Sequence, residues 1–268
     1  MLGSVFAKSM RDLRRSLLWW SAGLVGLVSM IAAVYPTVRD NPELNELVES
    51  YPEALKAFIA FGGSVDYVSG AGYLGSELFS FMVPLLFVVA AIASGAGSIA
   101  GEEERGTLEL LLSQPVTRRR VAAEKLAATV AELAVLTIVL WLAVWSGAAL
   151  AGMDVSGWEA LSASLTAGAL ALALGAVAFI LGAATGRKAL AIGLSAAAAV
   201  ASYLVNALAA LVSALEPAQR LSPFYHYAVG DPLRQGVAPG HVAFLLVLAA
   251  AAATAGIAAF ERRDLHLP

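Results

Sequence analysis

Six long apolar runs restrict the folds open to this chain more than any other feature of its sequence. A helix needs about 20 mostly apolar residues to cross the ~30 Å hydrocarbon layer of a bilayer, and the runs have that length. They cover residues 17–35, 77–100, 126–151, 159–184, 189–213 and 241–260. Only 14% of the residues are charged, too few to cover the surface of a soluble domain this long. The sequence therefore predicts an all-α, multi-pass membrane protein whose residues 1–268 form a single transmembrane domain.

The distribution of basic residues orients these spans. If the N-terminus lies inside, thirteen of the 17 Lys and Arg residues are cytoplasmic and four are external, as the positive-inside rule requires. The inside group is Lys8, Arg11, Arg14, Arg15, Arg105, Arg118, Arg119, Arg120, Lys125, Arg187, Lys188, Arg262 and Arg263, and the outside group is Arg39, Lys56, Arg220 and Arg234. An odd number of spans would remove this asymmetry. We therefore expect a protein of the cell membrane with both termini in the cytoplasm.

Residues 1–16, which precede the first run, have a different pattern. Apolar residues recur there at helical spacing, while the basic residues fall mostly on other faces. This pattern is typical of an amphipathic helix in the inner membrane interface, with Trp19 and Trp20 near the headgroups. The alternative is a frayed basic N-terminus. The first run itself is too long for a signal peptide and lacks a small-residue cleavage site, so we expect it to remain as an anchor.

The loop between the second and third runs, residues 101–120, has the pattern of a short amphipathic helix. Three leucines share one face at i, i+3, i+4 spacing: Leu108, Leu111 and Leu112. We expect Glu102–Glu104 in its first turn, where the helix macrodipole favours anions, and Pro115 at its end. The apolar stripe has to be buried against the spans or against another protein. A partner that grips such a helix could transmit a movement into the second and third spans.

The string E-E-R-G-T-L-E-L-L-L-S-Q-P-V-T-R in this loop resembles the first cytoplasmic loop of ABC type-2 permeases, the membrane subunits of ATP-driven exporters. The likeness extends over the chain and includes the 185–188 turn and the Ser222–Tyr227 segment. It implies a coupling helix that docks on a separate ATPase subunit, and a smaller second contact at Arg187 and Lys188. It also implies a second permease copy, identical or related. The coupling-helix residues would be Glu102, Glu103, Glu104, Arg105, Gly106, Thr107, Leu108, Leu111, Leu112 and Pro115.

No ATP-binding loop of the form G-x-x-x-x-G-K-[ST] is present in the sequence. In the nearest segment, residues 182–189, the glycines are one residue too close and no hydroxyl follows the lysine. We therefore expect no cofactor in this chain, with ATP and Mg²⁺ held by the partner ATPase. There is no cysteine, and His226, His241 and His266 lack metal-binding spacing. We expect no catalytic residue, no metal site and no nucleic-acid partner.

Glu132 lies about two helical turns inside the third run, where an ionised carboxylate costs roughly 2.5–3.5 kcal/mol near the membrane centre. It is a candidate for the substrate pathway, and pairing with a polar neighbour in the bundle explains it equally well. It also supports an alternative function, an ion-coupled secondary transporter, which would depend on an ion gradient rather than on ATP and a partner. An intramembrane enzyme is disfavoured, because no second catalytic group stands at membrane depth beside Glu132.

Overall fold

The computed structural model describes residues 4–39, 41, 50, 69–209 and 211–264, and the regular structure within these residues is helical. Six stretches among them are long and apolar enough to cross a membrane, as the sequence predicts. Their main helices are α1 (Val5–Arg39), α5 (Met82–Glu104), α7 (Arg118–Ala151), α8 (Gly157–Thr185), α9 (Lys188–Ala209) and α12 (Pro239–Arg262). The shorter elements are α4 (Gly70–Leu74), the π-helical turn η1 (Gly75–Phe79), α6 (Thr107–Leu112), the 3₁₀ turn η2 (Ser213–Leu215), α10 (Glu216–Gln219) and α11 (Pro223–Ala228).

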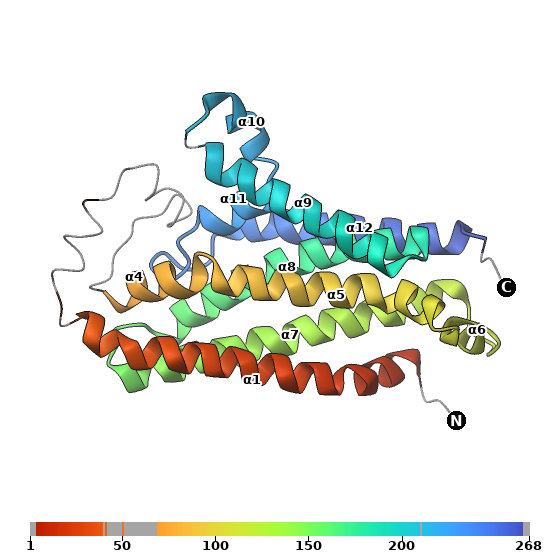
Figure 1. Cartoon of the computed structure of the whole chain (residues 1–268), viewed down its shortest axis with the longest axis horizontal. Coiled ribbons are helices and arrows are strands. Elements are labelled where there is room, and N and C mark those ends of the chain that lie inside the picture. Colours follow the sequence, from red (N-terminus) through yellow and green to blue (C-terminus); the bar gives the residue numbers. More distant parts are fainter. Residues whose placement is uncertain (1–3, 40, 42–49, 51–68, 210, 265–268) are drawn as a thin grey trace.

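The long helices lie side by side and alternate in direction, so both described ends of the chain lie near α6 (Figure 1). We call this side of the bundle the α6 end and the opposite side the α4 end. The thirteen basic residues expected inside all belong to helix ends or connections at the α6 end. Arg39, Arg220 and Arg234 belong to the α4 end, and Lys56 lies outside the described residues. The charge asymmetry of the sequence is therefore an asymmetry of the folded bundle.

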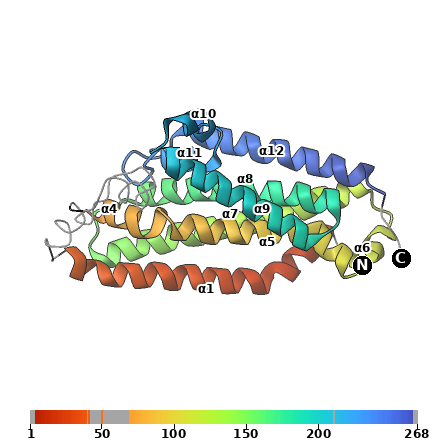
Figure 2. The same ribbon diagram turned by 45° about the horizontal axis from the view of Figure 1, so that its top comes forward.

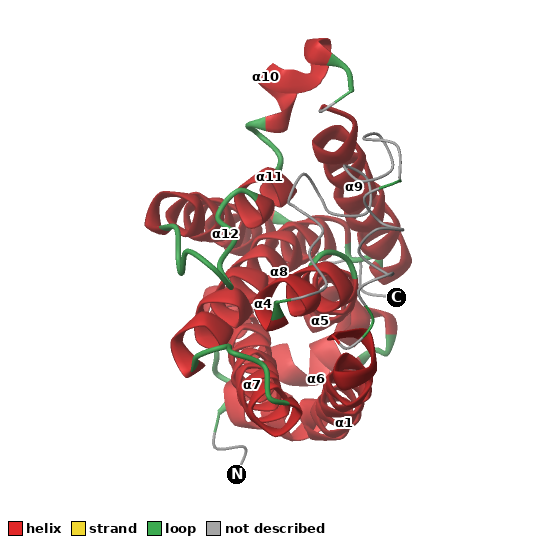
Figure 3. Cartoon of the chain, turned by 90° about the vertical axis from the view of Figure 1, so that its left-hand side faces the viewer, coloured by secondary structure: helices red, strands yellow, loops and turns green. Residues whose placement is uncertain are grey.

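Helix α8 occupies the centre of the bundle and packs against α5, α7, α9 and α12, while α1 packs on α7 (Figure 3). The contact between α5 and α8 is the tightest that the described glycines show. A Cβ atom added at Gly95 would lie 2.2 Å from the carbonyl oxygen of Gly175. Small residues allow such close approach of helix backbones, which replaces the missing hydrophobic driving force between helices in a lipid environment.

Local capping signals determine several helix boundaries. Ser156 and Glu159 form a reciprocal capping box at the start of α8, with both side-chain-to-backbone hydrogen bonds present. The Thr117 hydroxyl accepts from the backbone N–H of Arg120 at the start of α7. Gly152 and Gly186 cap the C-terminal ends of α7 and α8, with φ angles of +68° and +67° that favour glycine. These caps account for the short connections on both sides of α8.

The interfacial helix expected over residues 1–16 is not a separate element, because α1 is one uninterrupted 35-residue helix from Val5 to Arg39. Neither glycine nor proline stands between Val5 and Trp20, so nothing in the sequence breaks the backbone hydrogen bonding there. The first turns of α1 curve toward α6 (Figure 2). They are also tied to the bundle, since the backbone N–H of Phe6 donates to Glu124 on α7 at 2.9 Å. The basic segment is therefore an extension of the first span.

Candidate functional site

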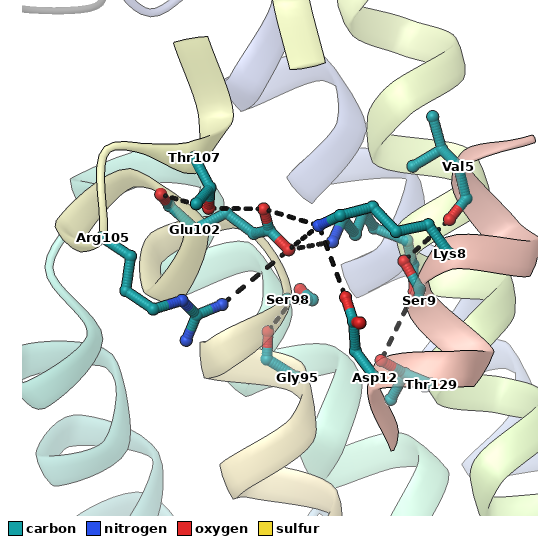
Figure 4. Close-up of polar contacts among 11 residues, drawn as sticks. Val5, Lys8, Ser9, Asp12, Gly95, Ser98, Glu102, Arg105, Thr107 and Thr129 are labelled. Atoms are coloured by element: carbon teal, nitrogen blue, oxygen red, sulfur yellow. Dashed lines mark hydrogen bonds and ion pairs between the residues drawn. The ribbon is translucent and has the colours of Figure 1, made fainter. Parts of the chain in front are cut away.

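A buried carboxylate at the α6 end joins three long helices. Glu102, in the last turn of α5, has a side chain only 4% exposed. Its Oε1 atom accepts from the ammonium group of Lys125 on α7 at 2.6 Å and from that of Lys8 on α1 at 3.0 Å (Figure 4). The Lys125 side chain is equally buried, at 5% exposed, whereas that of Lys8 is 28% exposed. Charge-assisted hydrogen bonds of this kind are about twice as strong as neutral ones.

The same carboxylate also holds α6. The Thr107 hydroxyl lies 2.7 Å from Glu102 Oε2 and 3.1 Å from the Glu102 carbonyl oxygen, so it is positioned to donate to either (Figure 4). Only Arg105 and Gly106 separate α5 from α6, and Gly106 makes the sharp turn with a φ of +68°. We call Lys8, Glu102, Thr107 and Lys125 the Glu102 junction. Through it, α1, α5, α6 and α7 are connected at one point.

The prediction that Glu102–Glu104 begin the amphipathic helix is wrong, because these residues end α5 and α6 begins at Thr107. At a helix C-terminus the macrodipole disfavours anions, so cations or N–H groups have to stabilise each carboxylate. Glu102 has the junction lysines, Glu103 forms an ion pair with Arg263, and Glu104 accepts from the backbone N–H of Lys188 at 2.8 Å. The glutamates thus connect the end of α5 to its neighbours.

The leucine stripe of α6 faces the protein's own helices. Leu108 and Leu111 are 2% and 6% exposed and belong to a small core at the α6 end that includes Phe179 and Phe260. Of the two alternatives that the sequence leaves open for this stripe, these two leucines therefore adopt the first and pack on the protein's own spans, and Leu112 is half-buried. The outer face of α6 instead presents Leu110, which is 72% exposed. Glu109 is exposed beside it, and Pro115 lies exposed beyond the helix end.

The two residues of the second predicted contact, Arg187 and Lys188, have different environments. Arg187 is exposed in the short connection between α8 and α9. Lys188, the first residue of α9, is half-buried, and its side chain lies against α5: a Cβ added at Gly97 would be 3.6 Å from Lys188 Cε. Of this pair, Arg187 remains the residue that a partner could reach.

Comparison with known proteins agrees with this architecture. A family model described as ABC-2 family transporter protein matches residues 4–265, almost the whole chain. The chain belongs to this family. This match confirms the resemblance drawn from the loop sequence. A search of curated proteins finds no match. ABC-2 permeases are typically non-catalytic transport subunits and generally partner with ATPase subunits.

In this ABC-2 transporter, Glu132 is buried in α7 away from the bundle surface, at 2% exposed. Its carboxyl group interacts with the hydroxyl group of Ser94 on α5. Ser94 also hydrogen-bonds Thr129 across the two helices, at 3.2 Å. The second oxygen, Oε2, has no hydrogen-bond partner among the described residues. Glu132 is thus a poorly satisfied polar group inside the bundle, about one helical turn from Thr129.

Two of the three histidines, expected to be apart, lie together at the α4 end of the transporter. The Nδ1 atoms of His226 and His241 are 2.9 Å apart, and His226 Nε2 lies 2.9 Å from the carbonyl oxygen of Arg220. Since a carbonyl only accepts, His226 Nε2 carries a proton and His241 Nδ1 donates to His226. Burial, and secondarily His241, lower the pKa of His226 from its ordinary value. Within the described residues, no group of three or more His, Cys, Asp or Glu side chains is arranged to hold a metal.

Sequence reasoning missed the junction lysines, counting Lys8 and Lys125 only as positive charges on one side. One signal could have found them. Both residues stand within helical apolar patterns, and a lysine buried there needs a carboxylate nearby. Glu102, two residues after the second apolar run, was one candidate.

Proposed function

We propose that this chain is the transmembrane subunit of an ATP-driven exporter, with the α6 end in the cytoplasm. It forms the substrate pathway with a second permease copy in the cell membrane, and a separate ATPase subunit supplies the energy from ATP and Mg²⁺. The concentration of basic residues at the α6 end supports this orientation, because cytoplasmic segments carry an excess of Lys and Arg.

The observation that carries this proposal is the two-sided environment of α6. Its inner face is fixed by Leu108, Leu111 and the Thr107–Glu102 hydrogen bonds, while its outer face exposes Leu110 and Glu109. A partner that binds the outer face therefore grips an element that cannot shift independently of the bundle. A displacement of α6 would pass to α5 through the two-residue connection, and to α1 and α7 through the Glu102 junction.

The coupling contact that we propose differs from the one that the leucine spacing predicts. The partner-facing residues are Glu109 and Leu110 on α6, with Arg187 in the neighbouring connection, all of which are exposed. Leu110 would supply the apolar anchor of the contact and the charged residues its polar rim. This division is usual at protein interfaces, where a few central apolar groups carry most of the binding energy.

A direct test is Leu110→Asp in the full chain, co-expressed with its ATPase subunit and purified from membranes. Burying a leucine at an interface contributes about 1.5–3 kcal/mol, so we expect the affinity for the ATPase to fall roughly tenfold or more. Membrane insertion and thermal stability should stay unchanged, because Leu110 makes no part of the core.

The matched control is Leu221→Asp, which places the same change at a leucine of equal exposure, 74% against 72%, at the α4 end. We expect this variant to keep full association. If Leu110→Asp binds the ATPase and transports as the unchanged protein does, α6 is not the coupling contact.

An ion-coupled secondary transporter is the alternative, and it is favoured by the buried Glu132, whose Oε2 atom has no hydrogen-bond partner in the described part of the chain. A carboxylate in such a position is a common feature of proton and ion pathways. The two functions differ in their energy source. Transport by the reconstituted chain alone, driven by an ion gradient and unaffected by ATP, would support the alternative and exclude the exporter.

A further inference from the structure

A polar cavity of about 500 Å³ lies beside the Glu102 junction. Its walls come from the first turns of α1 and α7, the last turns of α5, the start of α6 and the first residue of α9. Six charged residues line it: Lys8, Asp12, Glu102, Arg105, Lys125 and Lys188. Four of them are cations and two are carboxylates, so the cavity has a net charge of +2.

The carboxylates are already shared among three of these cations. Glu102 lies 2.6 Å from Lys125, 3.0 Å from Lys8 and 3.8 Å from Arg105, and Asp12 lies 3.4 Å from Lys8 (Figure 4). The positive charges thus outnumber the negative ones in a partly enclosed space, where water screens them less than at an open surface.

The fourth cation, Lys188, is held at the cavity without a carboxylate. Its stem lies along the glycine face of α5: Cβ atoms added at Gly97 and Gly101 would be 3.6 Å from its Cε and Cδ atoms. Among the described residues, no acidic oxygen lies within ion-pairing distance of its ammonium group. The carboxylate of Glu104 is engaged by the backbone N–H of Lys188, and Glu103 pairs with Arg263.

Hydrogen-bond donors for a ligand would come from the cations. The hydroxyl protons of Ser94 and Ser98 already go to Thr129 and to the Gly95 carbonyl oxygen. Lys188 retains its three N–H donors, and the Arg105 side chain is 60% exposed with only a long contact to Glu102. A point charge and a guanidinium fork beside one cavity are the groups that proteins use to bind phosphate.

We infer that this cavity binds a phosphate group, carried by an anionic phospholipid of the inner leaflet. Its lining residues between 93 and 107 and between 125 and 129 straddle the expected inner boundaries of the second and third spans, and those between 8 and 13 lie a few residues before the first span, at the level where headgroups lie. Basic pockets between spanning helices on the cytoplasmic side are suited to anionic headgroups. The inference rests on the proposed orientation of the α6 end, and a headgroup bound there would contact the same helices that the Glu102 junction connects.

The test uses the full chain purified in a neutral detergent, without any ATPase. Thermal unfolding is followed while short-chain phosphatidylglycerol, short-chain phosphatidylcholine or inorganic phosphate is added. We expect saturable stabilisation by phosphatidylglycerol and little by phosphatidylcholine, whose choline cancels the phosphate charge. Equal stabilisation by both lipids would overturn the inference. Stabilisation by inorganic phosphate at the same low concentrations would keep a phosphate site and overturn the lipid as its source.

Two neighbouring lysine and arginine positions provide the matched variants. Lys188→Gln should weaken the apparent affinity for phosphatidylglycerol about five- to tenfold, since one basic residue near a charged headgroup contributes that much. Arg187→Gln removes the same charge from the adjacent exposed residue, which does not line the cavity, and should leave the affinity unchanged. Lys188→Arg should retain binding. If both glutamine variants lose the same affinity for phosphatidylglycerol, the lipid is attracted by general surface charge, and the proposed binding site in the cavity is wrong.

These results are separable from the coupling proposal. The lipid titration contains no ATPase, and the ATPase association of Leu110→Asp requires no added lipid. Failure of one experiment therefore leaves the other intact.

Discussion

Replacing Glu102 by glutamine removes the negative charge of the junction while keeping the shape of the side chain. The glutamine can still accept from Thr107, but Lys125 is left as a buried ammonium without a carboxylate. Lys8 is 28% exposed and also pairs with Asp12, so it can relax toward water at small cost. Most of the penalty therefore comes from Lys125. Breaking a buried ion pair on one side costs about 3–5 kcal/mol, and we expect Glu102→Gln to lose that much stability.

The companion variant Lys125→Met separates this electrostatic penalty from the loss of packing. It removes the buried cation, and Glu102 keeps its hydrogen bond from Lys8. The double variant, Glu102→Gln with Lys125→Met, leaves no buried unpaired charge. We expect it to be more stable than Glu102→Gln alone, because neutralising both members of a buried pair is often nearly neutral.

The assay is equilibrium unfolding of the purified chain in mixed micelles, followed by tryptophan fluorescence, with the two single variants and the double variant as a thermodynamic cycle. We expect a coupling energy between the two substitutions of roughly 2–3 kcal/mol, which is at the upper end of the values found for contacting residues. Additive losses, or a loss below about 1 kcal/mol for Glu102→Gln, would show that the carboxylate is not the connection between α1, α5 and α7.

Two further predictions follow from contacts elsewhere in the bundle. Gly95→Ala should destabilise the protein by about 1–3 kcal/mol or more, because the new methyl group would meet the Gly175 carbonyl oxygen and force α5 and α8 apart; the same unfolding assay measures it. Near the α4 end, the lowered pKa of His226 means that the unfolded chain binds more protons below pH 6.5. Stability should therefore be greatest above that pH and fall as the pH decreases toward the folded pKa, and His226→Phe should flatten this part of the profile.

Each of these two predictions has a clear contrary result. Gly23→Ala adds the same methyl group where nothing lies within 4 Å, so an equal loss at both positions would refute the packing argument for Gly95. For the histidine pair, a stability profile that rises as the pH is lowered below 6.5 would contradict the sign of the shift, and an unchanged profile in His226→Phe would assign it to another group.

The amino-acid sequence by itself determined the all-helical class, the six candidate spans and the membership of the ABC-2 family. The helical class and the spans depend on the free energy of moving each residue from water to lipid, and the family membership is indicated by a local loop motif. Both features can be identified from the sequence alone. The helix ends are equally local, as the Ser156–Glu159 capping box and Gly152 show.

Only the tertiary structure decided which faces of these helices meet. Glu102 pairs with Lys8, 94 residues away, and with Lys125, 23 residues away, and the leucine stripe of α6 turns inward against Phe260. The sequence does not distinguish Gly95 from the many other small residues of the chain, and its close contact with Gly175 is seen only in the packed pair of α5 and α8. The physical reason is that hydropathy measures whether a helix enters the membrane, whereas its rotation depends on packing against neighbours. In surfaces rich in Ala, Leu and Gly many rotations have similar local patterns, and a few buried polar contacts distinguish them.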